Sequence, residues 1–280
     1  MLTTTNVEAA GSDWTGAIWQ TNGTGTAGSP VAGNAYVMIF NGVSAGNALN
    51  NTRIRNPAGT SSTFPGDSLT INTNCELREK SGVSGVAVNF PGTNGSPGLI
   101  LSGGLLNAGS SYALPIQVVG RIQVNHQSYI SNGAGGAGGG FNTDTGTRQW
   151  NLAGVLSGTG NIVLINNKDS VPQIISGTSN TFSGQWIVQC GWLQAAGTNS
   201  LGTNSITVNP GYTGYTNDMP QATSPSPTSP DANFPSLTGA VFEPGYDLNS
   251  AGTLTLVNGG KMNLHQNCTF TAVTCPSSVV

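Results

Sequence analysis

The sequence is short of charge. Asp, Glu, Lys and Arg make up only 7% of the 280 residues, against about 25% in a typical soluble domain. Surface helices need such residues, whereas the abundant Gly, Asn and Thr form helices poorly, so a mainly helical protein is excluded. The net charge is −3 and the basic residues gather only as the pairs Arg53/Arg55 and Arg78/Lys80. We therefore expect no nucleic-acid partner.

The sequence also lacks long apolar runs. No run reaches the roughly 18 residues that suggest a membrane-spanning helix, so we expect no membrane span. The first ten residues, MLTTTNVEAA, contain neither a basic nor an apolar region, so no signal peptide is visible. The composition nevertheless looks extracellular, with few charges and abundant Ser, Thr and Asn. We expect an extracellular or cell-surface location.

Cysteine is scarce, and its spacing predicts no metal site. Cys75, Cys190, Cys268 and Cys275 form no CxxC pair, and no His lies at metal-ligand spacing from them. Cys190 alternates with the apolar Val188, which predicts a buried, inert thiol. Cys268 and Cys275 lie on either side of a strand-like segment, so they are candidates for a disulfide in an oxidising compartment. We expect no metal and no cofactor.

Glycine is abundant instead, at 41 of 280 residues, about twice its usual share. From residue 67 onward, short β-prone segments follow one another, separated by Gly, Asn and Ser. No segment has the i, i+3, i+4, i+7 apolar stripe of a helix. The pattern predicts one β region over residues 67–280, with a glycine-rich loop at 131–146 and a Pro/Ser/Thr-rich loop at 219–235.

Residues 1–66 are more irregular than the rest and are rich in aromatic side chains. They contain Trp14, Trp19, Tyr36, Phe40 and Phe64 among Gly, Asn and Pro. Aromatic residues near a chain end suggest a cap that covers the end of a β stack. An ordinary start made of strands and loops is the alternative.

Weak internal repetition predicts a solenoid. The segments LSGTGNIVLI (156–165) and ISGTSNTFSGQWIV (175–188) share a Ser-Gly-Thr, then an Asn, then a strand. A spacing of roughly 20 residues is typical of the rungs of a solenoid. In such a fold, inward and outward side chains alternate, and the chain turns at Gly and Asn, which tolerate a positive φ.

The stretch SGTSNTFSGQWIVQCGWLQAAGTNSLGTNSITVN (176–209) resembles the autotransporter-associated β-strand repeat, and the likeness is clearest over residues 156–209. The resemblance implies a right-handed parallel β-helix of a bacterial surface or secreted protein. It implies a scaffold and a location and carries no catalytic residues. The matching positions are Ile175-Ser176-Gly177, Asn180-Thr181-Phe182-Ser183-Gly184, Val188, Gly191, Leu193, Leu201-Gly202 and Ile206-Thr207-Val208-Asn209.

Candidate catalytic residues are few. The seven Asp and four Glu are scattered, whereas polysaccharide lyases and hydrolases need clustered carboxylates. In the densest patch, Glu76, Arg78 and Lys80 share one strand face, which predicts a salt-bridged face towards solvent. His126 is in phase with apolar neighbours, which predicts a core or edge position. No GxSxG, HExxH, P-loop or dinucleotide fingerprint is present, and we do not expect an enzyme.

The tryptophans are the candidate contact residues. Trp186 is in phase with Val188, which predicts an inward position. Trp192 follows Gly191, where a bend changes the phase, so it is a candidate to face outward. An exposed Trp stacks on a sugar ring or packs into a neighbouring subunit. Trp14 and Trp19 are further candidates for ligand or subunit contact, and core or cap packing is the alternative.

Together these patterns predict an all-β chain, a right-handed parallel β-helix with an irregular, aromatic-rich N-terminal cap. The predicted function is that of an extracellular structural protein, a fibre or surface-scaffold subunit that self-associates through open sheet edges. The alternative is a carbohydrate-binding adhesin that takes glycans as partners. The third hypothesis is a polysaccharide-degrading β-helix enzyme, which needs at least three converging acidic residues.

Overall fold

The fold was analysed in a computed structural model of the chain. It describes residues 2–4, 13–21, 24–40, 52–57, 59–79, 85–108, 116–131, 149–165, 172–197, 199–202, 204–208, 241–244, 248–249, 252–257, 260–262 and 268–275. These residues form strands β1 to β26 and no helix. The prediction of an all-β chain is thereby confirmed for this part. The predicted loops at 131–146 and 219–235 lie outside the described residues, apart from residue 131.

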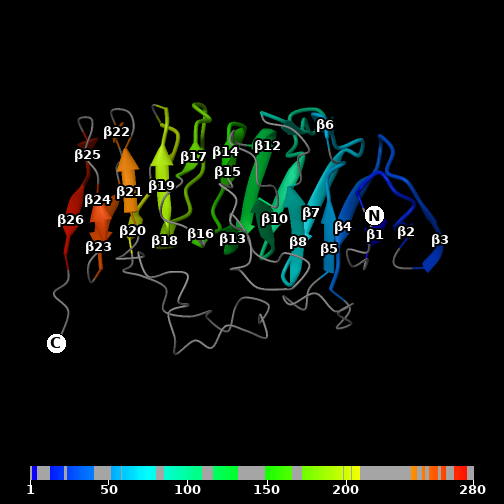
Figure 1. Cartoon of the computed structure of the whole chain (residues 1–280), viewed down its shortest axis with the longest axis horizontal. Coiled ribbons are helices and arrows are strands. Elements are labelled where there is room, and N and C mark those ends of the chain that lie inside the picture. The colour runs from blue at the N-terminus through cyan, green and yellow to red at the C-terminus, as the bar shows by residue number, and fades with distance from the viewer. Residues whose placement is uncertain are drawn as a thin grey trace.

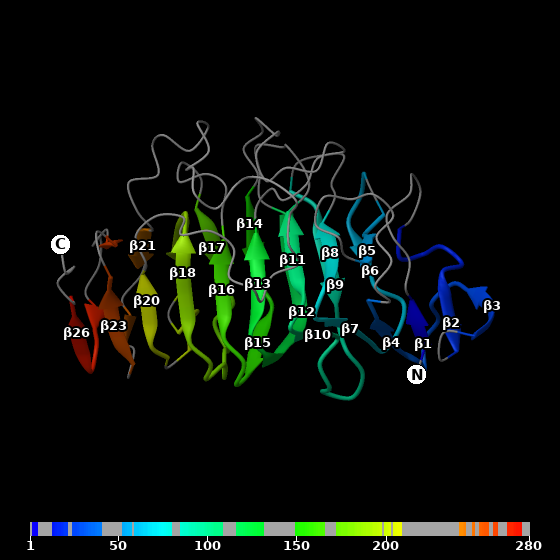
Figure 2. The ribbon, with the colours of Figure 1, turned by 90° about the horizontal axis from the view of Figure 1, so that it is seen from below.

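The strands stand side by side in a long row, with the N-terminal strands at one end and the C-terminal strands at the other (Figures 1 and 2). One long sheet, called sheet B here, contains nine strands that all pair in parallel. Its strands, in order, are β5 (Thr52–Arg55), β8 (Cys75–Glu79), β11 (Leu105–Ala108), β13 (Ser128–Ser131), β16 (Ile162–Ile165), β18 (Trp186–Cys190), β20 (Ile206–Val208), β23 (Thr253–Leu256) and β26 (Ala272–Thr274).

The second large sheet has two parts, which the long strand β12 (Ile116–His126) joins. Sheet A contains the C-terminal half of β12 with β1 (Leu2–Thr4), β2 (Trp19–Thr21), β3 (Thr24–Gly28), β4 (Ala35–Met38), β7 (Ser68–Asn72), β10 (Leu99–Ser102) and β15 (Val155–Gly158). Sheet C contains its N-terminal half with β6 (Ser62–Thr63), β9 (Ala87–Phe90), β14 (Trp150–Leu152), β17 (Gln173–Ile175), β19 (Trp192–Ala195), β21 (Val241–Pro244) and β24 (Lys261–Met262). A small third sheet pairs β22 (Leu248–Asn249) with β25 (Cys268–Thr269).

The chain visits the three sheets in a fixed order. It passes through sheet C in β9, sheet A in β10 and sheet B in β11, and then repeats the cycle in β12 and β13 and again in β14, β15 and β16. Each new turn pairs in parallel with the turn before it. This order is consistent with a solenoid-like parallel β fold. The pairing continues across the long connections, since Thr207 pairs with Thr255.

The core consists of side chains that stack in rows from one turn to the next. In sheet B one row is Ile54, Leu77, Leu106, Ile130, Leu164, Val188 and Val208, and every member is at most 1% exposed. Alternate residues of most strands point the other way, as in the pattern iBiBi along β7. The inward residues, every second one along each strand, therefore stack into a continuous apolar interior along the row of strands.

Corners between sheets are made at residues that tolerate close approach or a positive φ. Gly120 has a φ of +99° at the point where β12 passes from sheet C to sheet A. A Cβ at Gly154, one turn later, would lie 2.5 Å from the carbonyl oxygen of Gly120. Asn74 and Asn199 also have a positive φ, which confirms the prediction that the chain turns at Gly and Asn.

The N-terminal end of the stack combines antiparallel pairing with aromatic packing. Strand β1 pairs in parallel with β4 but antiparallel with β2, and β2 pairs antiparallel with β3. In the same part of the stack, neighbouring rings pack edge to face with centroids 5.0 to 5.6 Å apart, a favourable geometry. The rings belong to Trp14, Trp19, Tyr36, Phe64 and Phe90, all at most 2% exposed.

The division of the chain at residue 66 stays a prediction. Strands β4 and β5 lie before this position, and they pair in parallel with β7 and β8, which lie after it. Parallel stacking therefore already includes residues 35–38 and 52–55.

Candidate functional site

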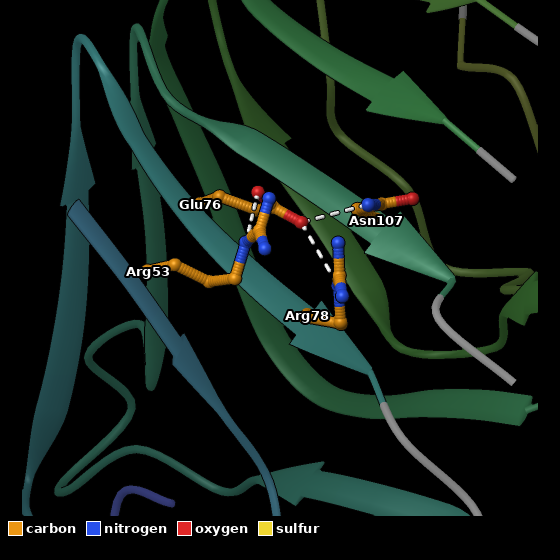
Figure 3. A network of polar contacts seen from close by, with 4 residues as sticks. All are labelled: Arg53, Glu76, Arg78 and Asn107. Atoms are coloured by element: carbon orange, nitrogen blue, oxygen red, sulfur yellow. Dashed lines mark hydrogen bonds and ion pairs between the residues drawn. The ribbon is translucent and has the colours of Figure 1, made fainter. Parts of the chain in front are cut away.

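The densest group of charged residues lies on the outward side of sheet B. Glu76 of β8 accepts hydrogen bonds from Arg53 of β5, Arg78 of β8 and Asn107 of β11 (Figure 3). The distance from Arg53 Nε to Glu76 Oε2 is 2.6 Å, from Arg78 Nε to Glu76 Oε1 3.2 Å, and from Asn107 Nδ2 to the same Oε1 2.7 Å. The four residues form an ionic network across three neighbouring strands.

The sequence predicted a salt-bridged face towards solvent for Glu76 and Arg78, and this prediction is half wrong. The ion pair exists, but Glu76 is 0% and Arg78 8% exposed, and all five residues of β8 are buried. The error has a physical reason. Strand β8 is buried on both of its faces, and alternation along a strand cannot reveal that its outward face is covered as well. Lys80, the third member of the predicted face, lies outside the described residues.

The network is suited to holding strands together. The Glu76 carboxylate shares its two oxygens among two guanidinium groups and one amide, so the buried charge is compensated on both oxygens. Register pairing puts Arg53 opposite Glu76, and Asn107 opposite Arg78. The side chains therefore link three successive turns of the chain. In this network the charged groups pair with one another.

Glu79, at the end of the same strand, is a buried carboxyl of a different kind. It is 1% exposed, and neither carboxyl oxygen has a hydrogen-bond partner in the part of the chain that the structure describes. By alternation it follows the inward Cys75 and Leu77, and it pairs in register with the buried Ala108. Burial raises the pKa of Glu79 from its ordinary value of 4.5 to about 8. At neutral pH the group is therefore protonated and neutral.

Sequence reasoning missed Glu79, although a signal was present. The pattern Cys75, Glu76, Leu77, Arg78, Glu79 alternates inward and outward, which puts Glu79 in phase with two apolar residues. A carboxyl in an inward phase, with no basic residue in the same phase, is a candidate for a raised pKa.

Two of the candidate tryptophans lie in the core. Trp14 is 0% and Trp19 is 1% exposed, and the Nε1 of Trp19 donates a hydrogen bond to the Trp14 carbonyl at 2.9 Å. Trp186 is also fully buried, and its Nε1 donates to the Leu201 carbonyl at 2.9 Å, so its predicted inward position is confirmed. Core packing thus accounts for the position of these three rings.

Trp192 occupies a different environment. In β19 it is half-buried, as is Gln194 two residues later, whereas the alternate residues Leu193 and Ala195 are buried. Trp192 therefore lies on the outward side of sheet C, where part of its side chain remains accessible.

Among the described residues, the cysteines and histidines do not gather into a site. Cys75 is buried, which raises the pKa of its thiol to about 12. Cys268 is half-buried and Cys275 exposed, both are free thiols, and the candidate disulfide is not formed in this structure. The side chain of Cys190 and the second histidine, His265, lie outside the described residues.

His126 was predicted to lie in the core or at an edge, and it is exposed. Val124 pairs with Leu101, but the next pair joins His126 to Ser102, so the register slips by one residue between them. This irregularity reverses the phase in which the sequence put His126. Within the described ranges, no three His, Cys, Asp or Glu side chains form a group that could hold a metal. The described residues also contain no helix that is long and apolar enough to cross a membrane.

Strand β26 is the last strand of sheet B among the described residues. Strand β26 pairs with β23 on one side, and on its other side no strand follows among the described residues. All three residues of β26 are exposed. Val273 continues the buried row Trp186, Ile206, Leu254, yet it is 57% exposed.

The chain matches no protein-family model, no curated protein and no solved structure.

Proposed function

We propose that the chain is a right-handed parallel β-helix with a structural function, a fibre or surface-scaffold subunit that self-associates outside the cell. The repeated order of sheets C, A and B supports the helical path. Connections between parallel strands of one sheet are right-handed in nearly all proteins, which supports the handedness. The resemblance of residues 156–209 to the autotransporter-associated repeat supports the location at a bacterial surface or in the medium.

The exposure of β26, which pairs on one side only among the described residues, is the observation that carries the proposed function. An uncovered strand presents a row of backbone donors and acceptors that pair readily with another chain. Natural proteins protect such edges with charges, prolines or bulges. Strand β26, with the sequence Ala-Val-Thr, contains none of these residues and exposes the apolar Val273.

Low charge supports the same function. Chains that assemble through like surfaces are kept apart by net charge, and only 7% of the residues here are charged. The best-defined group of charged residues, around Glu76, is paired internally and buried. The sheet faces instead carry rows of uncharged hydroxyls such as Thr207, Thr255 and Thr274.

Sedimentation velocity over a wide range of protein concentration tests the proposal, with negative-stain microscopy of the same samples. We expect discrete or extended assemblies that dissociate on dilution. A single monomeric species at every concentration, together with isolated particles on the grid, would contradict self-association.

A carbohydrate-binding adhesin is the second candidate, and the outward position of Trp192 favours it. A partly exposed indole beside Gln194 offers a flat apolar ring and an amide, the pair of groups that sugar recognition uses. Binding on a glycan array that Trp192→Ala abolishes and Trp192→Phe retains would support this function. Binding that survives Trp192→Ala would remove the reason for it.

A further inference from the structure

The outward side of sheet C carries a row of side chains in register over successive turns. Gln117 of β12 pairs with Asn151 of β14, Asn151 with Ile174 of β17, and Ile174 with Gln194 of β19. Each of these four side chains is exposed or half-buried, whereas the residue that follows it along the strand is buried. The row therefore crosses four neighbouring strands of the stack, and three of its four members are amides.

The row provides hydrogen-bonding groups without charge. An Asn or Gln amide has two N–H donors and an oxygen acceptor. The Ser176 hydroxyl donates to Asn151 Oδ1 at 2.7 Å, which orients this amide with its nitrogen away from Ser176. Residues 116–120 of β12 and strands β14, β17 and β19 contain no Asp, Glu, Lys or Arg. The next register position beyond Gln194 is Glu243 of β21, whose side chain lies outside the described residues.

An uncharged ligand suits such a row. A ligand that covers a charged side chain removes water from it, which is costly unless the ligand brings the opposite charge. Amides avoid this cost and pair equally well with hydroxyl donors and acceptors. The chemistry of the row therefore favours a neutral ligand that is rich in hydroxyl groups.

Trp192 lies at one end of the row. It precedes Gln194 by two residues on the same side of β19 and is half-buried. The indole has a flat apolar face and tolerates a partly wet environment. A ring platform on one strand, with amides on strands further along the stack, is an arrangement that fits a ligand longer than a single sugar ring.

The backbone of these strands is not available to a ligand. Strands β14 and β17 each pair in parallel with a strand on both sides. Peptides that add to a sheet need a free strand edge for their main-chain hydrogen bonds. A ligand on this side of sheet C must bind through side chains, as a glycan does with its hydroxyl groups.

We propose that the row Gln117, Asn151, Ile174 and Gln194, together with Trp192, is a binding strip for one extended, uncharged, β-linked glycan. This inference rests on the second candidate function, the carbohydrate-binding adhesin, and gives it a ligand class. Paired strands are about 4.8 Å apart, and the ring-to-ring repeat of an extended β-linked glycan is close to this spacing. Successive rings therefore meet successive turns of the chain, with the first ring on Trp192.

Calorimetric titration of the full chain tests the length and the charge of the ligand. The probes are neutral β-1,4-linked oligosaccharides of glucose, mannose and N-acetylglucosamine, from disaccharide to hexasaccharide. We expect affinity for at least one series to increase up to the tetrasaccharide, because the row crosses four strands. Oligo-β-mannuronate has the same linkage and a carboxylate on each ring, and it should bind at least about tenfold more weakly because the strip has no positive charge to compensate it.

Gln117 and Gln123 provide a matched pair of variants. Gln117 lies three strands away from Trp192, so Gln117→Ala should weaken binding of the hexasaccharide by about three- to tenfold, as expected for one lost hydrogen bond, and leave the disaccharide unchanged. Gln123 is also an outward glutamine of β12, but it lies beyond the corner at Gly120, in sheet A. Gln123→Ala should change neither affinity. Equal melting temperatures check that both variants are folded, which their accessible positions favour.

The outcomes separate the inference from the second candidate function. Binding that depends on Trp192 but neither increases with length nor weakens in Gln117→Ala would overturn the extended strip and leave an adhesin intact. The same conclusion would follow if a glycan array showed binding only to glycans of other linkage, or if oligo-β-mannuronate bound as tightly as the neutral series. Absence of carbohydrate binding on the array and in the titrations would contradict both.

Discussion

Replacing Glu79 by Gln is expected to stabilise the protein, by an amount that increases with pH. In the folded chain the Glu79 carboxyl is 1% exposed and without a hydrogen-bond partner in the described region, and its pKa is about 8. In the unfolded chain its pKa is 4.5, the ordinary value. Between these two values the folded chain binds a proton that the unfolded chain has released, so the free energy of unfolding falls as pH rises.

The magnitude follows from the distance between the two pKa values. One pKa unit corresponds to about 1.4 kcal/mol. Relative to acidic solution, the wild-type chain therefore loses about 3 kcal/mol of stability at pH 7 and about 5 kcal/mol above pH 8. Gln has the same shape and no ionisation. Glu79→Gln should thus match the wild-type protein at pH 4 and exceed it by about 3 kcal/mol at pH 7.

Urea denaturation at pH 4, 7 and 9, followed by tryptophan fluorescence, measures these differences. Glu76→Gln is the matched control, because it is the same substitution on the same strand at a carboxylate that two arginines pair. Removing one member of a buried ion pair costs about 3–5 kcal/mol, so this variant should be less stable at pH 7. A stability difference for Glu79→Gln that does not change with pH, or has the opposite sign at pH 9, would refute the reasoning.

Two further predictions follow from close packing and burial. Gly154→Ala puts a Cβ 2.5 Å from the Gly120 carbonyl oxygen and should destabilise the protein by about 1–3 kcal/mol. The control Gly28→Ala has nothing within 4 Å of its Cβ and should change stability by less than about 0.5 kcal/mol. Thermal melts compare the two variants, and equal melting temperatures would be inconsistent with the glycine corner. Cys75 has a buried thiol with a pKa of about 12, so it should resist iodoacetamide at pH 8 in the native protein while the exposed Cys275 reacts. Mass spectrometry of the alkylated peptides measures the labelling of each thiol, and equal labelling of the two would disprove the burial of Cys75.

The sequence predicted the all-β class of the described residues correctly, from composition and from the pattern of short segments. Gly, Asn and Thr in place of charged helix formers exclude helices, and β-branched residues in short runs form strands. It also predicted that Trp186 points inward, since a period of two decides the side of a strand. The positive φ at Asn74 and Asn199 likewise follows from residue type. These properties are local, so neighbouring residues are sufficient to determine them.

The candidate site was predicted less well. The sequence put Glu76 and Arg78 on one strand face and expected water on that face. Arg78 lies on the same strand, but the other two partners of Glu76 come from other turns of the chain, Arg53 from the turn before and Asn107 from the turn after. His126 lies on the other side of its strand from the predicted one, because the pairing of β10 with β12 shifts by one residue, and no local pattern predicts this shift.

The sequence by itself determined that this chain forms neutral, alternating strands with corners at Gly and Asn, because propensity and alternation act between near neighbours. Only the tertiary structure decided which carboxyl is paired and which is isolated, Glu76 or Glu79, because stacking sets the neighbours of each strand over intervals that local patterns do not encode. It also decided that the aromatic rings pack together near the N-terminal end and that β26 is exposed. Whether an edge is covered depends on which strands pair with it, and pairing is a property of the assembled sheet.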